Sequence, residues 1–206
     1  MPSELKNLDC VLYHSGSVPN RLGLAGYLDA FPRGTPTGKA AEIGVWRGDF
    51  SDGFLQRWSG DRLYLIDPWA KLPEDEYEDV RNRDYDPADY DFVRDRMAWA
   101  GDRVEFIRKT SAEAAKDFPH ECLDFVYIDA NHAYRHVYED LQRWWLRVRP
   151  GGILAGHDVF EPSHPGVTAA LVEFCLTRGL RADVILGEYT EGHLVQAHSF
   201  FIVKPV

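Results

Sequence analysis

Short apolar runs alternate with helix-like segments along residues 39–206, and this alternation constrains the fold more than any other feature of the chain. The apolar runs have the length of strands and stand at residues 41–45, 62–66, 103–107, 123–128 and 153–155. Between them, apolar side chains recur at helical spacing, as Val137, Leu141 and Trp144 do. Strands that alternate with helices form right-handed βαβ units around a mostly parallel sheet. The sequence therefore predicts one α/β domain with a doubly wound, Rossmann-like sheet.

The two ends of the chain and one internal segment depart from this alternation. Two late strands are predicted near residues 182–186 and 199–203, and no helical pattern separates them, so we expect a hairpin with one antiparallel strand. Residues 1–38 contain several prolines and glycines and are predicted to form an N-terminal extension that could cap a substrate, which leaves 39–206 as the domain itself. Residues 71–90 are acidic and weakly periodic, and they form either a lid over the site or a solvated insertion.

The composition narrows the class of protein and its partners. With a net charge of -10, the chain lacks the basic surface that a general nucleic-acid binder needs to displace counterions. No apolar run approaches the roughly 20 residues of a membrane span, and the N-terminus lacks the pattern of a secretory signal. Cys10, Cys122 and Cys175 are far apart and fit reduced thiols. We therefore expect a cytoplasmic protein with a small-molecule partner, and a homodimer is left open.

A glycine turn follows the first predicted strand of the domain, with the sequence Glu42-Ile-Gly44-Val-Trp46-Arg-Gly48. A dinucleotide fingerprint, G-x-G-x-x-G, needs its middle glycine so that the backbone can approach a pyrophosphate, and Trp46 stands in that place. Glu42 would repel a pyrophosphate but suits a ligand that carries an ammonium and a sulfonium. Asp67 ends the next strand, where an acid can accept hydrogen bonds from ribose hydroxyls. The turn favours S-adenosylmethionine (SAM) over a dinucleotide; alternatively, Gly44 and Gly48 serve only a tight turn.

Acids and histidines follow two further strands. Asp129 and His132 come directly after the strand at residues 123–128, and His157 and Asp158 come after the next one. Ligands bind at the carboxyl ends of such strands, so we expect these four side chains to lie close together. Asp129, His157 and Asp158 could hold a divalent cation, with the imidazole shifting preference from magnesium toward manganese, iron or zinc. His132 could then act as a general base. On the alternative interpretation, these residues only bond and cap the chain.

Five short motifs together carry a resemblance to a known family. They are Glu42-x-Gly44-x-x-x-Gly48, Asp67-Pro68-Trp69, Asp129-x-x-His132-x-Tyr134, Pro150-Gly151-Gly152 and Gly156-His157-Asp158. Over residues 40–160 the chain resembles the class I SAM-dependent methyltransferases. Within them it is most similar to the macrolide-sugar (macrocin-type) O-methyltransferases, which are related in fold to catechol O-methyltransferase. The resemblance implies a seven-stranded sheet in the order 3-2-1-4-5-7-6, with the last strand antiparallel.

The resemblance also implies roles for individual residues. SAM would contact Glu42, Gly44 and Gly48 through its methionine part, with Trp46 beside them, Asp67 through its ribose, and Pro68, Ser111 and Ala112 through its adenine. Asp129 would lie between cofactor and metal, His132 would be the base, and Asp158 would be a metal ligand. His157 departs from the pattern, because the metal-dependent relatives carry an acid there. The cation, magnesium or manganese, is therefore an open part of the prediction, and a metal-independent enzyme is the alternative.

The predicted activity is methyl transfer from SAM to a hydroxyl of a small molecule, such as a sugar or a secondary metabolite. Two rival functions stay open, a NAD(P)-dependent oxidoreductase on a similar sheet and a non-catalytic SAM-binding module. The remaining histidines have no comparable partners in sequence and are predicted to be surface or packing residues; they are His14, His120, His136, His164, His193 and His198.

Overall fold

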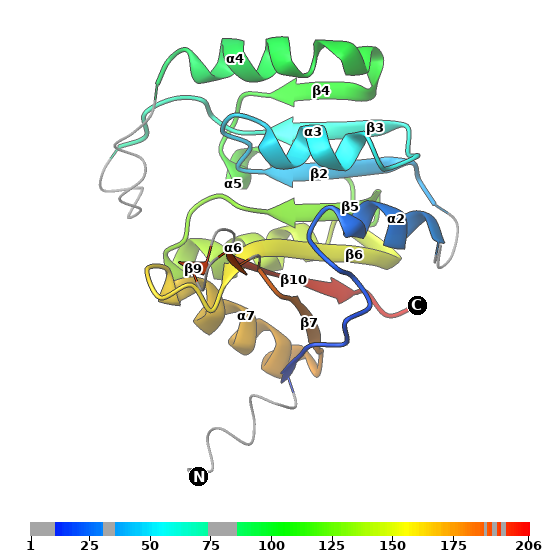
Figure 1. Ribbon diagram of the computed structural model, residues 1–206, viewed down its shortest axis with the longest axis vertical. Coiled ribbons are helices and arrows are strands. Elements are labelled where there is room, and N and C mark those ends of the chain that lie inside the picture. Colours follow the sequence, from blue (N-terminus) through cyan, green and yellow to red (C-terminus); the bar gives the residue numbers. More distant parts are fainter. Residues whose placement is uncertain (1–10, 31–35, 74–85, 188, 191–192, 195–196) are drawn as a thin grey trace.

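The computed structural model describes residues 11–30, 36–73, 86–187, 189–190, 193–194 and 197–206, which build one large sheet covered by helices (Figure 1). Its strands are β1 (Leu12–Tyr13), β2 (Lys39–Ile43), β3 (Arg62–Ile66), β4 (Val104–Ile107), β5 (Leu123–Ile128), β6 (Val148–Val159), β7 (Ala182–Ile185) and β10 (His198–Val203). A separate two-stranded hairpin consists of β8 (Tyr189–Thr190) and β9 (His193–Leu194). The described helices are α2 (Gly23–Ala30), α3 (Asp49–Leu55), α4 (Asp89–Arg96), the 3-10 helix η2 (Ala98–Arg103), α5 (Ser111–Ala114), α6 (Tyr134–Trp145) and α7 (Pro165–Arg178).

The sheet has the predicted topology. Its strands lie in the order β1-β7-β10-β6-β5-β2-β3-β4. Strands β2 to β6 pair in parallel, while β10 runs antiparallel to both β6 and β7. Counted without β1, this is the order 3-2-1-4-5-7-6 with an antiparallel last strand, so the predicted fold is confirmed. The predicted count of seven strands is one short, because Leu12 and Tyr13 add an edge strand parallel to β7.

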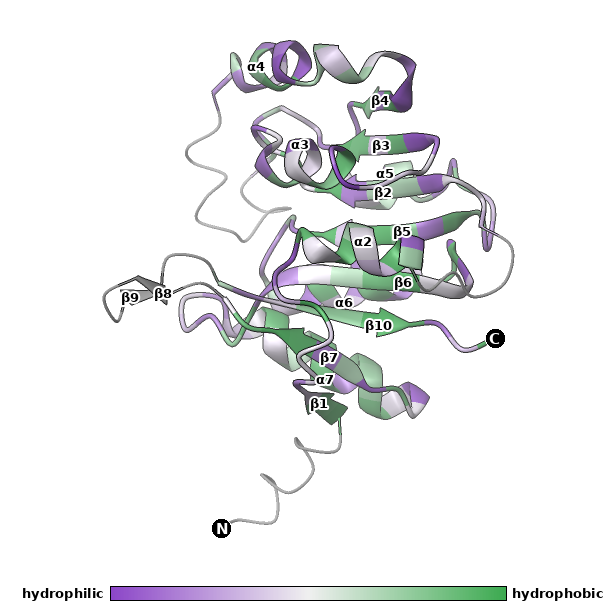
Figure 2. Ribbon diagram, turned by 45° about the vertical axis from the view of Figure 1, so that its right-hand side comes forward, coloured by the Kyte–Doolittle hydropathy of each residue, from purple (hydrophilic) through white to green (hydrophobic). Residues whose placement is uncertain are grey.

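Helices cover both faces of the sheet. In Figure 1, α2 and α3 lie in front of it, and α6 and α7 lie behind its lower half. All six residues of β5 are buried, as expected for a central strand covered on both faces, and Figure 2 shows how apolar the central strands are. Phe125 and Tyr127 of β5 pack on the α3 side, where the Tyr127 ring stacks on Phe50 with centroids 3.8 Å apart. Val126 and Ile128 belong to the core under α6 and α7.

A buried ion pair fixes the amino end of β5. Asp124 and Arg149 are both nearly inaccessible, and the Arg149 guanidinium donates to the Asp124 carboxylate. The same carboxylate accepts backbone N–H bonds from Thr37, at 2.9 Å, and Gly38, at 2.7 Å, just before β2. A buried charge is tolerated when it is paired and hydrogen-bonded in this way. The pair therefore ties β2, β5 and β6 together at the end of the sheet opposite the predicted site.

The described part of the N-terminal extension packs against the domain. The backbone N–H of Ser15 donates to the Asp183 carboxylate at 2.9 Å, next to the pairing of β1 with β7. Farther along, Leu24 and Ala25 of α2 are fully buried in the core on the α3 side. The segment from Leu12 to Ala30 thus runs from one edge of the sheet onto its front face (Figure 1).

Residues 74–85 of the predicted lid lie outside the described residues.

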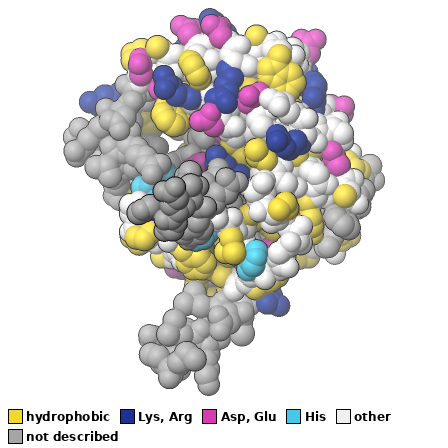
Figure 3. Space-filling view, in the orientation of Figure 1, with side chains coloured by type: hydrophobic (Ala, Val, Ile, Leu, Met, Phe, Trp, Pro, Cys, Tyr) yellow, Lys and Arg dark blue, Asp and Glu magenta, His cyan; other side chains and the backbone are white. Residues whose placement is uncertain are grey.

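Charges of both signs are interspersed on the face that carries α3 and α4 (Figure 3). Arg96 of α4, for example, pairs with Asp49 and Asp52 of α3. The described part of this face therefore carries acidic and basic side chains side by side. Among the described residues, no helix is both long enough and apolar enough to cross a membrane.

Candidate active site

Backbone strain gathers at the carboxyl edge of the parallel strands. Five non-glycine residues among those described have positive φ, and four of them, Trp46, Trp69, Asp158 and Phe160, lie at or just after the ends of β2, β3 and β6, with φ between 40° and 61°. Such conformations cost on the order of 1–3 kcal/mol each and persist where the surrounding structure holds them. Strain of this kind clusters at functional sites, which makes this edge the candidate site.

Both glycines of the turn are required by the chain itself. Gly44 has φ 83°, and a Cβ there would lie 2.1 Å from the carbonyl oxygen of Asp129. Gly48 adopts a left-handed conformation as the N-cap of α3, and a Cβ there would lie 2.6 Å from Val93. The turn, residues 44–48, is called the cradle below. It lies directly against the end of β5, which brings Asp129 beside it.

The Asp67 carboxylate holds the turn in shape. It accepts backbone N–H bonds from Val45 and Trp46, both at 3.0 Å, and from Trp69 at 2.7 Å. Burial raises the pKa of Asp67, while these three backbone bonds act in the opposite direction. The predicted ribose-binding acid is thus anchored at the end of β3 beside the turn, and it also shapes the loop that would contact the ligand.

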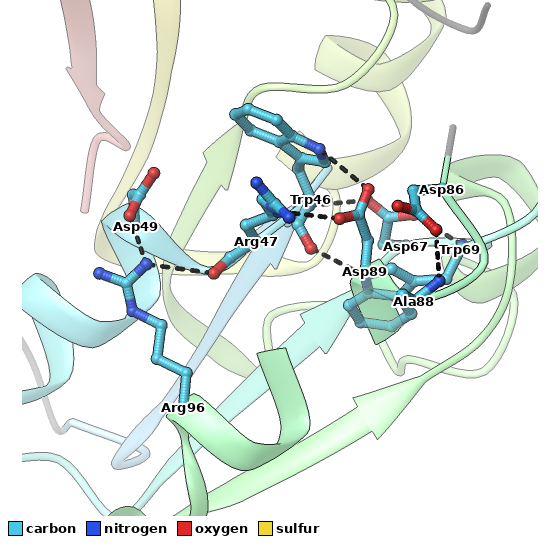
Figure 4. A network of polar contacts seen from close by, with 9 residues as sticks. All are labelled: Trp46, Arg47, Asp49, Asp67, Trp69, Asp86, Ala88, Asp89 and Arg96. Atoms are coloured by element: carbon cyan, nitrogen blue, oxygen red, sulfur yellow. Dashed lines mark hydrogen bonds and ion pairs between the residues drawn. The ribbon is translucent and has the colours of Figure 1, made fainter. Parts of the chain in front are cut away.

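Trp46 is fixed through each of its polar groups, although 61% of it is exposed. Its N–H binds Asp67, its carbonyl oxygen accepts from the Trp69 indole at 2.9 Å, and its own indole donates to Asp89 at 3.1 Å. Arg47 donates to the other oxygen of the Asp89 carboxylate at 2.8 Å (Figure 4). Asp89, a buried residue at the start of α4 that no sequence motif singles out, thereby connects α4 to the turn. A large ring is held rigidly at the edge of the cradle.

Glu42 lies below the turn on β2 and is only 2% exposed. Burial raises its pKa to about 8, and the neighbouring Asp129 adds to the shift, while a hydrogen bond from the Ser51 hydroxyl opposes it. Ser51 lies inside α3 and donates to Glu42. A buried carboxyl with a raised pKa is a group that an incoming cation would stabilise in its charged form.

The two acids and two histidines predicted at this edge do come together. The His132 Nε2 atom lies 2.8 Å from Asp158, and His157 Nδ1 lies 3.1 Å from the other oxygen of the same carboxylate. Asp129 lies 3.7 Å from His132 and 3.8 Å from His157. Burial acts to raise the pKa of Asp158, but its bonds and charge interactions with the two histidines outweigh burial and lower that pKa well below its usual range. Asp158 is therefore a carboxylate that holds two imidazoles.

His164, which was predicted to be a surface or packing residue, packs into this cluster. Its ring stacks on His132 with centroids 4.1 Å apart and planes 21° from parallel, and the residue is 7% exposed. His164 is the N-cap of α7 and directly precedes Pro165. That Pro is a helix-start signal shortly after β6, so the sequence indicates where α7 begins but not that His164 meets His132.

The donor set at this edge fits a divalent cation. Ligand atoms of Asp129, His157 and Asp158 lie within 4.8 Å of one another, and the same holds for His132, Asp158 and His164. Carboxylates alone would suit magnesium, but imidazole nitrogen in the set favours manganese, iron or zinc. These side chains therefore fit a borderline cation better than a hard one.

The residues predicted to border the adenine lie after β4. Helix α5 begins at Ser111, and its N-cap Thr110 forms a capping box with Glu113. The Ser111 hydroxyl donates to the buried Asp140 and accepts from the Trp144 indole at 2.9 Å. Burial raises the pKa of Asp140 to about 7, with the Ser111 bond opposing the shift. The Ser111 side chain is thus engaged inside the protein.

Comparisons with known proteins bear on the family and the fold. A family model described as a methyltransferase domain matches residues 41–159, while no curated protein matches the sequence. Among solved structures, the O-methyltransferase NovP aligns with a TM-score of 0.64 and 16% identity over 89% of this chain and 76% of its own. The O-methyltransferase TomG from Streptomyces achromogenes, solved in complex with SAM, aligns with a TM-score of 0.53 and 19% identity over 81% of this chain and 73% of its own. An O-methyltransferase from Bacillus cereus, in complex with S-adenosylhomocysteine (SAH), aligns with a TM-score of 0.55 and 16% identity over 97% of this chain and 96% of its own.

At these identities the solved structures show a shared fold. The family model covers more than half of the 206 residues, including the glycine turn and the ends of β5 and β6. It therefore decides between the rival enzyme classes, in favour of a methyltransferase and against an oxidoreductase. The prediction of a methyltransferase is confirmed, and the chain belongs to the methyltransferase domain family.

Proposed function

We propose that the protein transfers a methyl group from SAM to a hydroxyl group of a small molecule. The observation that carries this proposal is the His132–Asp158 pair, 2.8 Å apart beside Asp129 and next to the glycine turn. A pair of this kind is the arrangement of a general base and the group that orients it. Hydroxyls need such a base, because they are poor nucleophiles until their proton is removed.

The carboxyl edge supplies the contacts that SAM requires. When bound, SAM supplies a methyl group on a sulfonium, which an aligned acceptor oxygen can take by in-line displacement. Asp129 and Glu42 would bind the ammonium of its methionine part, with Glu42 releasing its proton as the ammonium binds. Asp67 would accept hydrogen bonds from the ribose hydroxyls. The ring of Trp46 would border the turn on the side where the methyl acceptor binds. The main contribution of these residues is alignment of the two reactants.

His132 would remove the proton from the acceptor hydroxyl. Asp158 is the poorer candidate for the base, because its lowered pKa makes it a weak proton acceptor near neutral pH. Its role would be to hold the imidazole by the contact at 2.8 Å. His164, stacked on His132, would restrict the ring to this orientation.

A divalent cation held by Asp129, His157 and Asp158 would assist this reaction. Such a cation lowers the pKa of a bound hydroxyl and fixes its position. The donor set favours manganese, iron or zinc over magnesium. Activity that survives exhaustive chelation would remove the cation from the proposal while leaving the base in place.

Calorimetry with SAM and SAH tests the cofactor first, and absence of binding at millimolar ligand would overturn the proposal. Formation of SAH is then measured with a panel of phenols, catechols and sugars as acceptors. His132→Ala should lower turnover by about 10²- to 10⁴-fold while it leaves SAM affinity nearly unchanged. His120→Ala is the matched control, since His120 is exposed near the amino end of β5. An unchanged rate in His132→Ala would remove His132 from the mechanism.

A further inference from the structure

The charge balance of the cradle is one-sided where the methionine part of SAM would lie. Asp129, together with Glu42 once it releases its proton, provides negative charge for an ammonium, and Asp67 adds a third acid beside the turn. An amino acid end carries a carboxylate on the same carbon as its ammonium, so a hydrogen-bond donor for that carboxylate is expected within a few ångströms of these acids. A site that is specific for a zwitterion pairs the ammonium with an acid and the carboxylate with a donor or a cation.

Arg21 is a cation that reaches this place from the N-terminal extension. It lies two residues before α2, and its side chain is only 18% exposed. The guanidinium approaches Asp129 to 3.9 Å, lies 5.7 Å from the centre of the Phe50 ring, and hydrogen-bonds the Tyr127 side chain. It also interacts electrostatically with Glu42. Arg21 therefore lies between the ends of β2 and β5, on the face that carries α3.

We propose that Arg21 binds the carboxylate of the methionine part of SAM, an inference that rests on the proposed function. A guanidinium presents its N–H donors in a fixed fork that matches a carboxylate with two parallel hydrogen bonds. Phe50 and Tyr127 fix the orientation of that fork. The separation of 3.9 Å from Asp129 is that of an ion pair rather than a hydrogen bond. Arg21 and Glu42 would then bind the two opposite charges of one zwitterion.

The assignment gives the N-terminal extension a role in cofactor binding. Family resemblance begins only near residue 40, so nothing in the matched motifs points to residue 21. The extension is nonetheless fixed to the domain on both sides of Arg21, by the pairing of β1 with β7 and by the buried residues Leu24 and Ala25 of α2. Arg21 is thus held at the cradle by ordered structure before and after it.

The test measures binding rather than activity. Affinities for SAH and for its decarboxylated analogue, 5′-(3-aminopropylthio)adenosine, are determined by calorimetry for the wild type, Arg21→Met and Arg21→Lys. Arg21→Met should weaken SAH by about 10- to 100-fold and the analogue by less than about threefold, because only SAH has a carboxylate to lose. Arg21→Lys should fall between, since an ammonium keeps the charge but not the fork. Arg57→Met, at an exposed residue just after α3, is the matched control and should change neither affinity.

The possible results separate this proposal from the proposed function. Equal weakening of both ligands in Arg21→Met would show a structural role and overturn the assignment, as would unchanged SAH affinity. If Arg21→Met does not fold, the wild type and Arg21→Lys still decide. A wild type that binds SAH and the analogue equally well overturns the assignment. A wild type that binds neither overturns the proposed function as well.

Discussion

Glu42→Gln is the substitution that tests the cradle most directly. The side chain is buried, and its pKa is raised from 4.5 to about 8, mainly because burial disfavours the charged carboxylate. Between these two values the folded protein holds a proton that the unfolded chain has released. Stability is therefore lost as the pH rises through this window, and the loss is complete above pH 8. At about 1.4 kcal/mol for each pH unit, the ionised carboxylate costs the fold about 5 kcal/mol.

Glutamine keeps an acceptor for the Ser51 hydroxyl but removes the ionisable group. The free energy of unfolding, measured by urea titration from pH 5 to pH 9 at constant ionic strength, should fall more steeply for the wild type than for Glu42→Gln. The difference between the two proteins should change by about 4 kcal/mol over this range. The cost of burying the glutamine amide does not depend on pH, so it cancels when the difference between the two proteins at pH 5 is compared with that at pH 9. Glu105→Gln is the control, because Glu105 is an exposed acid on β4.

The same substitution should alter the pH dependence of SAM binding. An ammonium beside Glu42 favours the carboxylate, so binding releases a proton at a pH below about 8. Wild-type affinity should rise with pH between about 5 and 7, by up to tenfold for each unit, and the affinity of Glu42→Gln should be lower and nearly flat. Parallel stability profiles of the wild type and Glu42→Gln would refute the raised pKa. Equal affinities for SAM would refute the role of Glu42 in the cradle.

Three further predictions concern the turn, the cation and the opposite end of the sheet. Gly44→Ala forces a Cβ to within 2.1 Å of the Asp129 carbonyl oxygen at φ 83°, so urea titration should show a loss of at least about 2 kcal/mol; a loss below about 0.5 kcal/mol would contradict this. His157→Asp should shift calorimetric binding from manganese toward magnesium, and an unchanged preference would argue against His157 as a ligand. Arg149→Met leaves the buried Asp124 without its cation, so we expect a loss of about 3–5 kcal/mol, and a stability within about 1 kcal/mol of wild type would show that the amide bonds suffice.

Much of the fold and part of the site could be predicted because both depend on local pattern and on one topological rule. An apolar strand followed by Asp129 and His132, and another followed by His157 and Asp158, must meet at the same edge when the strands are parallel neighbours. The structure brings those four side chains together. The extra strand β1 could not be predicted, because two residues carry no periodicity and pair only with a strand 170 positions away.

The residues that prediction missed are those whose place depends on the path of a loop. His164 reaches His132 because the chain after β6 turns back before α7 begins, and no spacing rule predicts that turn. Arg21 meets Asp129 across more than a hundred residues of sequence. Ser111 illustrates the converse, since it does lie at the start of a helix, α5. Its hydroxyl nevertheless faces Asp140. A buried acid is destabilising without a hydrogen-bond partner, whereas a group at the solvated edge of the sheet can bond to water.

Strand β5 shows how a structural acid differs from one that serves a ligand, because it has one of each near its ends. Asp124, near the start, is 4% exposed and accepts close hydrogen bonds from Thr37 and Gly38 as well as from Arg149. Asp129, just past the end, has a side chain that is 24% exposed, and its contacts with His132, His157 and Arg21 lie at 3.7 to 3.9 Å, too long for hydrogen bonds. If Asp129 served only stability, close bonds like those of Asp124 would be expected. Its longer contacts, to Arg21 and to two imidazoles, are those expected of an acid placed to bind a group from outside the chain, and for this reason we place the proposed chemistry at this end of the sheet.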